Sequence, residues 1–123
     1  MLLALATGCD ILGIGTACTL IGCYNGIAVH LTALPSGPYK VEVIVAGAAP
    51  GLYEYDCPGG EACQQDVFFP ELVLDRIVVK VTTSLGSRIT EIANPVYETS
   101  RPNGPDCSPL CRQASVTAQL PGS

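Results

Sequence analysis

The residues of this sequence that are best suited to chemistry are its cysteines, seven in a chain of 123 residues. They are Cys9, Cys18, Cys23, Cys57, Cys63, Cys107 and Cys111. Cytosolic reductants keep thiols free, so this many cysteines in a small chain predict an oxidising compartment and disulfide bonds. Because the number is odd, we expect six of them to form three disulfides and Cys9 to have another role.

Four of these cysteines form two close pairs, Cys18 with Cys23 and Cys107 with Cys111. Each pair can bridge locally, or the two pairs can be cross-linked. The chain-entropy model favours the cross-link, because a loop of about a hundred residues contributes roughly 4.7 kcal/mol against about 2 kcal/mol for a very short one. A four-thiolate zinc site is the weaker alternative, since oxidising conditions consume the thiolates that the metal needs.

The remaining pair, Cys57 and Cys63, flanks the polar segment PGGEA, and we expect a tight loop between neighbouring strands to join them. Acidic residues gather around this loop, namely Glu54, Asp56, Glu61 and Asp66. Carboxylates at this density could bind calcium, but their spacing matches no calcium-binding loop. A solvated acidic loop is therefore the simpler interpretation.

His30 is the only histidine, and its alternation with Val29 and Leu31 directs it towards solvent. A hydrolase triad needs a nucleophile and an orienting carboxylate beside the histidine, and the sequence has no G-x-S-x-G motif. We therefore predict a surface histidine, with no catalytic residue, metal ion or cofactor.

The segment before Cys9, MLLALATG, combines an apolar run with small residues directly ahead of the cysteine. It resembles the lipobox of bacterial lipoprotein precursors, although Leu5 lies one position earlier than that pattern prefers. The resemblance implies cleavage before Cys9 and a diacylglycerol on its sulfur, which would hold the protein on a membrane without a transmembrane helix. The alternative is that residues 1–22 remain as an apolar anchor or arm, but Asp10 and the glycines after it make a poor membrane span.

The most distinctive loop is RPNGPDCSPLC, residues 101–111. Its prolines, its Asn-Gly turn and its two cysteines make it rigid, and a rigid loop loses little entropy on binding. We predict a recognition loop formed by Arg101, Pro102, Asn103, Gly104 and Pro105. The alternative, which the sequence supports about equally, is that this rigidity only closes the fold.

Short segments in which apolar and polar residues alternate fill the rest of the chain. They cover residues 25–33, 39–47, 51–57, 65–70, 75–84, 88–93, 95–100 and 114–120. Such alternation is typical of half-buried strands, and turn signals such as PSGP separate them. The sequence therefore predicts an all-β, disulfide-stapled antiparallel β-sandwich of about seven or eight short strands, immunoglobulin-like or fibronectin-like. A transthyretin-like sandwich has a similar pattern and stays open.

We expect three parts along the chain: a signal-peptide remnant at residues 1–8, a lipid-anchor and linker arm at 9–23, and one sandwich domain at 24–123. The six basic residues are scattered singly in a chain of net charge −5, so nucleic acid is not an expected partner.

Together these features predict an exported, lipid-anchored protein of the cell envelope that acts as a non-catalytic binding or structural module. Its partners would be the membrane, through the lipid on Cys9, and a protein or glycan at the cell surface. One alternative is a subunit of an extracellular assembly or filament, packed through its apolar N-terminal arm. Another is a small secreted enzyme or inhibitor.

Overall fold

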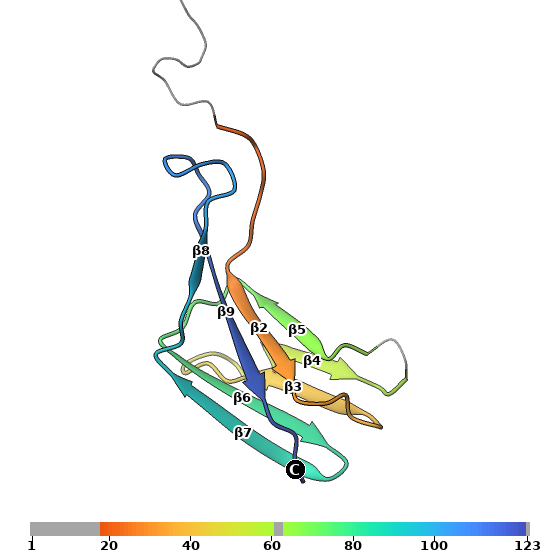
Figure 1. Ribbon diagram of the computed structural model, residues 1–123. Helices are drawn as coiled ribbons and strands as arrows, with labels where there is room; N and C mark the ends of the chain where they lie inside the picture. The colour runs from red at the N-terminus through yellow and green to blue at the C-terminus, as the bar shows by residue number, and fades with distance from the viewer. Residues whose placement is uncertain (1–17, 61–62, 123) are drawn as a thin grey trace, which may run out of the picture. The chain divides into compact units, whose positions relative to one another are not determined.

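The computed structural model describes residues 18–60 and 63–122, and Figure 1 shows that this part of the chain consists of strands and loops without a helix. The strands are β2 (Gly26–Leu31), β3 (Tyr39–Val43), β4 (Glu54–Cys57), β5 (Asp66–Pro70), β6 (Arg76–Thr83), β7 (Gly86–Ala93), β8 (Glu98–Ser100) and β9 (Cys111–Ala118). Each strand overlaps a segment in which apolar and polar residues alternate. The prediction of an all-β chain with about eight short strands is confirmed.

The strands form two sheets of four, in the orders β5-β2-β9-β8 and β4-β3-β6-β7. In the first sheet β2 is antiparallel to β5 and parallel to β9, with Gly26 opposite Gln113. In the second sheet β3 is antiparallel to both β4 and β6, and β6 is antiparallel to β7. Because β2 and β3 lie in different sheets, they do not form a hairpin with each other.

The core lies between the two sheets and is formed by every second residue of the strands. The largest fully buried side chains are Ile27, Val29, Leu31, Val41, Ile77, Val79 and Val81. They come from β2, β3 and β6, three of the four inner strands of the sandwich, and the fourth, β9, adds Ala114, Val116 and Ala118. Alternation along a strand sends one set of side chains inwards, so aliphatic residues at these positions specify the face that each strand buries.

The chain divides into two compact units. We call the first the stapled unit; its described residues are 18–24 and Thr99–Arg112. We call the second the sandwich unit; it contains Asn25–Glu98 and the residues from Gln113 onwards. The N-terminal arm that the sequence set apart from the sandwich therefore groups with the proline-rich loop.

Side-chain hydrogen bonds fix the connections of the sandwich unit. The Tyr97 hydroxyl accepts a hydrogen bond from the Leu74 backbone N–H (2.7 Å) and donates one to the Leu74 carbonyl (2.9 Å), which holds the segment between β5 and β6. At the turn between β6 and β7, the Thr83 hydroxyl accepts a hydrogen bond from Leu85 N–H, and Gly86 follows with a φ of 123°. Only glycine adopts that backbone angle without strain, so Gly86 marks where β7 begins.

Candidate recognition site

Two disulfides hold the stapled unit together. Cys18 bonds to Cys107 with a Cα–Cα distance of 5.8 Å, and Cys23 bonds to Cys111 with a Cα–Cα distance of 6.1 Å. This is the cross-linked arrangement that the chain-entropy argument favours. Since the earlier cysteine of one pair bonds to the earlier cysteine of the other, the two segments run in the same direction. With their sulfurs bonded in pairs, the four cysteines hold no thiolate for a zinc ion.

Asn103 lies in the interior of this unit and is 7% exposed. Its side-chain oxygen accepts hydrogen bonds from the Thr19 hydroxyl (2.5 Å) and from Ile21 N–H (2.7 Å). Its amide nitrogen donates to the carbonyls of Ile21 (2.8 Å) and Ser108 (2.7 Å). The amide thereby uses both of its donors and both of its acceptor positions. Asn103 cross-links two segments that are far apart in the sequence, and it is not available to contact a partner.

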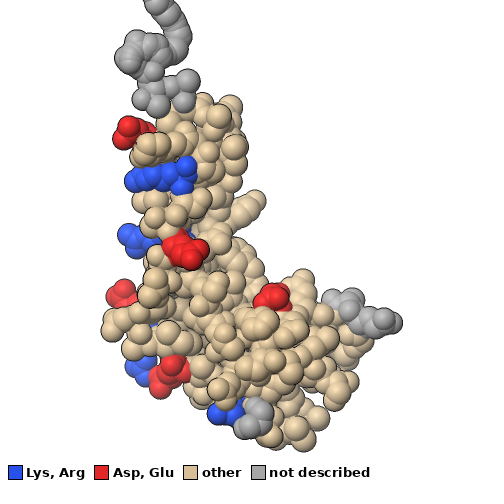
Figure 2. All heavy atoms as spheres, in the orientation of Figure 1, with Lys and Arg blue, Asp and Glu red and all other residues tan. Residues whose placement is uncertain are grey.

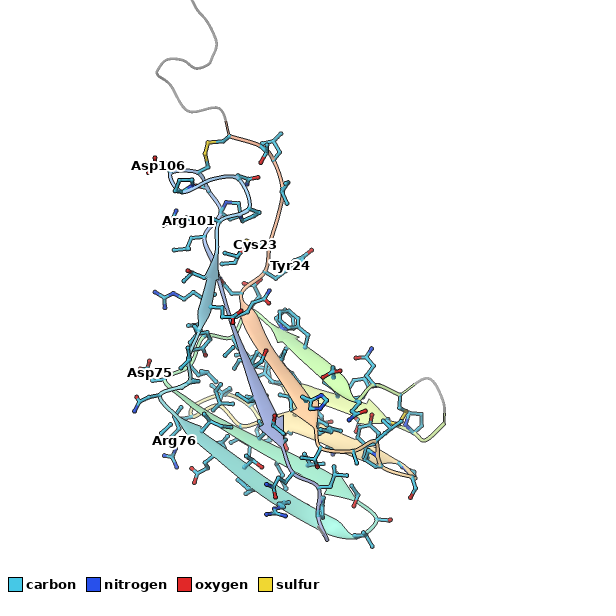
Figure 3. All side chains as sticks on the ribbon, viewed as in Figure 1. Cys23, Tyr24, Asp75, Arg76, Arg101 and Asp106 are labelled. Carbon is cyan, nitrogen blue, oxygen red and sulfur yellow. A yellow bond between two sulfur atoms is a disulfide. The ribbon has the colours of Figure 1, made fainter. Side chains whose placement is uncertain are left out.

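The predicted recognition loop has a buried centre and an exposed rim. Cys107 N–H bonds to the Gly104 carbonyl and Gly104 N–H to the Arg101 carbonyl, so two consecutive turns form the loop. Gly104 has a φ of 117°, which favours glycine. Arg101 and Asp106 extend into solvent (Figure 3), and Pro105 is also exposed. Of the predicted residues, Arg101 and Pro105 are therefore the ones whose side chains are most accessible.

The same unit exposes apolar side chains that the sequence analysis did not single out. Leu20 is 99% exposed and Ile21 is 56% exposed, although both lie between the two disulfide-bonded cysteines Cys18 and Cys23. The sequence does contain a signal for this exposure, because two adjacent aliphatic residues inside a short cysteine-bounded segment have little room to be buried.

In the sandwich unit, the third disulfide joins Cys57 to Cys63 as the sequence predicts. The strands on either side of it, β4 and β5, lie in different sheets, so the loop passes from one sheet to the other and does not connect neighbouring strands. Two tyrosines hold its end. Tyr39 donates a hydrogen bond to the Gln64 carbonyl, and the Tyr55 hydroxyl accepts one from Gln64 N–H (3.0 Å). Burial of the hydroxyl, and the neighbouring Tyr55, raise the pKa of Tyr39 above its ordinary value of 10.0.

His30 lies on the exposed face of β2, opposite Asp66 on β5. Its Nδ1 is 2.5 Å from an oxygen of Asp66, and both side chains are at least half exposed. The carboxylate orients the imidazole, as in a triad, but none of the described serines or threonines is hydrogen-bonded to His30. Thr117 is the residue opposite His30 on β9, and it makes no such bond. The pair is an exposed His–Asp hydrogen bond whose carboxylate partner the sequence did not reveal.

The acidic residues around the Cys57–Cys63 loop do not converge in the described part of the chain. Glu54 lies 3.5 Å from Lys40, and Asp66 pairs with His30. Glu61 is outside the described residues, as is the predicted acylation site Cys9. Among residues 18–60 and 63–122, no three His, Cys, Asp or Glu side chains form a group suited to a metal ion. Figure 2 shows basic and acidic side chains interspersed over the face drawn, without a large area of one sign.

The comparisons with known proteins do not name a family. No protein-family model, no curated protein and no solved structure matches the chain. Within the described ranges, no helix is long and apolar enough to cross a membrane. The functional argument therefore depends on the geometry of the two units.

Proposed function

We propose that this chain is an exported protein of the cell envelope, anchored by a lipid on Cys9, and that its two units act as a non-catalytic binding or structural module. Three disulfides in a chain of this size are typical of proteins that mature in an oxidising compartment. The sequence before Cys9 supplies the lipobox resemblance that would connect such a protein to a membrane.

The observation that carries this proposal is the construction of the stapled unit. Its buried side chains include Cys107 and Cys111, both in disulfides, and Asn103, which is polar. Because residues 18–24 and Thr99–Arg112 add no buried aliphatic side chain to these bonds, this part of the unit would lose its shape in a reducing compartment, where thiols are kept free. A protein that depends on its disulfides in this way is expected to work outside the cytosol.

A binding or structural role is supported because, in the part of the chain that the structure describes, the candidate catalytic residues lack the partners that catalysis would need. His30 has an orienting carboxylate but, among the described residues, no hydrogen-bonded nucleophile, and Glu54 of the acidic group near Cys57 pairs with Lys40. The stapled unit, in contrast, presents fixed exposed side chains, which is what a recognition surface needs.

Intact mass spectrometry of the exported protein tests the proposal. We expect a polypeptide mass that begins at Cys9 and carries acyl chains, and that increases by six hydrogens on reduction, two for each disulfide. The matched variant, Cys9→Ser, should lose the acyl mass and leave the membrane fraction while keeping all three disulfides. Unmodified Cys9 in the native protein, or six titratable thiols before reduction, would contradict the proposal.

A further inference from the structure

The segment from Cys18 to Cys23 exposes apolar side chains to water although its backbone is firmly held. Leu20 is 99% exposed, the most exposed large hydrophobic side chain of the described residues, and Ile21 is 56% exposed. Solitary exposed leucines are common on protein surfaces and need no explanation. This pair differs from them in how firmly its backbone is held.

The constraint acts on both sides of Leu20 and on Ile21 itself. Disulfides fix Cys18 and Cys23, two residues away in each direction from the pair. Between them, the buried Asn103 amide binds both the N–H and the carbonyl of Ile21 and accepts the Thr19 hydroxyl. With the backbone secured at these points, the exposure of Leu20 is a fixed feature of the unit. Because this segment is already ordered, it loses less conformational entropy on binding than a flexible segment would.

We infer that Leu20 and Ile21 form a lipid-insertion surface, which enters the interfacial region of the bilayer to which Cys9 is anchored. This inference rests on the proposed lipid anchor. Cys18 follows Cys9 by nine residues, which span at most about 30 Å when fully extended. The anchor therefore keeps this surface within about one bilayer thickness of the membrane.

The composition of the segment fits a lipid surface. Residues 18–24 contain no charged side chain, so insertion requires no charge to leave water. Tyr24, which directly follows Cys23, is 66% exposed, and tyrosine is enriched at the level of the lipid headgroups. Two aliphatic side chains alone bind a bilayer weakly, whereas acyl chains supply strong attachment. The role of the surface is therefore to orient the stapled unit on the membrane.

The chain contains no tryptophan, so a single introduced tryptophan reports its own surroundings. The test uses the acylated full-length variant Leu20→Trp in vesicles of phosphatidylethanolamine and phosphatidylglycerol with brominated acyl chains, which quench tryptophan in the lipid phase. The matched control is Leu85→Trp, since Leu85 is 76% exposed at the turn between β6 and β7 in the sandwich unit. Ile21→Trp provides a second reporter in case the first disturbs disulfide formation.

We expect the emission of the Leu20→Trp variant to shift to shorter wavelength and to lose most of its intensity, while the emission of the Leu85→Trp variant stays that of tryptophan in water. Equal, water-like emission from both variants would overturn the inference. So would a shift in the Leu20→Trp variant that appears only when envelope proteins are added, because that result identifies a protein partner.

The mass of the same sample separates this inference from the proposed anchor. If Cys9 is acylated and the tryptophan of the Leu20→Trp variant remains in water, the anchor stands and the lipid-insertion surface is wrong. If Cys9 carries no acyl chain, the anchor is wrong, and the purified variant is then mixed with an excess of the same vesicles. Quenching of its tryptophan under those conditions would support insertion by the segment itself, and the absence of quenching would overturn it.

Discussion

Asn103 is the residue on which the stapled unit depends most. Its four hydrogen bonds connect Ile21, Thr19 and Ser108, and three of the partner groups belong to the backbone. A buried polar group that loses its partner costs about 1–3 kcal/mol. In Asn103→Ala we therefore expect the Ile21 N–H to exchange with solvent about ten to a hundred times faster than in the parent, measured by hydrogen exchange.

Two further variants define the cause of that change. Asn103→Asp keeps the acceptor oxygen for Thr19 and Ile21 N–H but cannot donate to the two carbonyls, so it should also accelerate exchange at Ile21. Arg101→Ala removes an exposed side chain from the same loop and should leave exchange unchanged. If Asn103→Ala exchanged like Arg101→Ala, the amide would not hold the unit.

Gly26, at the start of β2, is required by close packing. A Cβ atom added there would lie 2.6 Å from the Phe69 carbonyl oxygen and would also meet the ring of Phe68. The ring can turn aside, but the carbonyl belongs to the neighbouring strand and cannot. We expect Gly26→Ala to lower the free energy of unfolding by about 1–3 kcal/mol, measured by urea denaturation.

The backbone origin of this effect has its own test. Removing the ring as well, in Gly26→Ala with Phe68→Ala, should not restore the loss caused by the first substitution, because the Phe69 carbonyl remains. Gly37→Ala is the control, since nothing lies within 4 Å of an added Cβ at that position. A full recovery in the double variant would assign the clash to the ring alone.

The roles of these two residues illustrate what a sequence hides. The Asn-Gly dipeptide at 103–104 correctly predicts a turn, because glycine follows at a φ of 117°. It does not predict that the asparagine faces inwards, since its partners Thr19 and Ile21 are more than 80 residues away. Of the recognition loop, the sequence therefore predicts the rigidity and the exposed Arg101, and not the buried centre.

The strands were predictable because their signal is local. Alternation within a segment such as β6, Arg76–Thr83, is enough to show that it is extended and which side chains are buried. Pairing is not local. The neighbours of β2 are β5 and β9, which lie about 40 and 87 residues further along the chain, and alternation holds no information about such partners.

In the loop between β4 and β5, the disulfide can be predicted from the sequence although the course of the loop cannot. Cys57 and Cys63 are close enough in sequence to be joined in almost any compact loop. That proximity predicted the disulfide, although the loop in fact passes between sheets. The two tyrosines that hold Gln64 come from β3 and β4, and only the three-dimensional structure brings their hydroxyls to it.

Tyr39 makes the stability of this connection dependent on pH. The pKa of its hydroxyl is raised in the folded state, so the folded protein binds this proton more tightly than the unfolded chain does. The contribution is fully present below pH 10.0, the ordinary value, and is lost as the pH rises through the raised pKa. Tyr39→Phe should cost about 1 kcal/mol at neutral pH, and its disadvantage should shrink at alkaline pH.

Urea unfolding of both proteins at neutral pH and above pH 10 measures this difference. Tyr53→Phe serves as the control, because the described contacts include no hydrogen bond from its hydroxyl. It should follow the parent protein through the alkaline range. A constant gap between Tyr39→Phe and the parent at all pH values would contradict the assignment.

For the whole chain, the cysteines carry information that alternation lacks, because a disulfide joins residues that are far apart. The cross-link between the two cysteine pairs was one of the two arrangements that the sequence left open, the one that chain entropy favours, and it brings residues 18–24 together with Thr99–Arg112. The division into two units was not predictable from the same argument. The two disulfides lie close together, and the segments that they join form a compact unit of their own, which goes beyond attaching the N-terminal arm to the sandwich.

The arrangement of these two disulfides predicts that their contributions to stability are not additive. Each bond alone closes a long loop, with sequence separations of 89 for Cys18–Cys107 and 88 for Cys23–Cys111. Once one is formed, the other closes only a small ring made of residues 18–23 and 107–111, which is six plus five, or 11 residues. In the chain-entropy model the second bond is therefore worth about 3 kcal/mol, and the two together about 7 kcal/mol.

We expect replacing either disulfide by a pair of serines to lower the free energy of unfolding by about 3 kcal/mol, and replacing both to lower it by more than the sum of the two single losses. Urea denaturation of the parent, the two single-disulfide variants and the variant lacking both gives the coupling directly. A matched control is the Cys57–Cys63 pair, which closes a separate loop with a sequence separation of 6 and should add its loss independently. Strictly additive losses for the two long-range bonds would contradict the chain-entropy account, in which the second bond closes only the small ring in the unfolded chain.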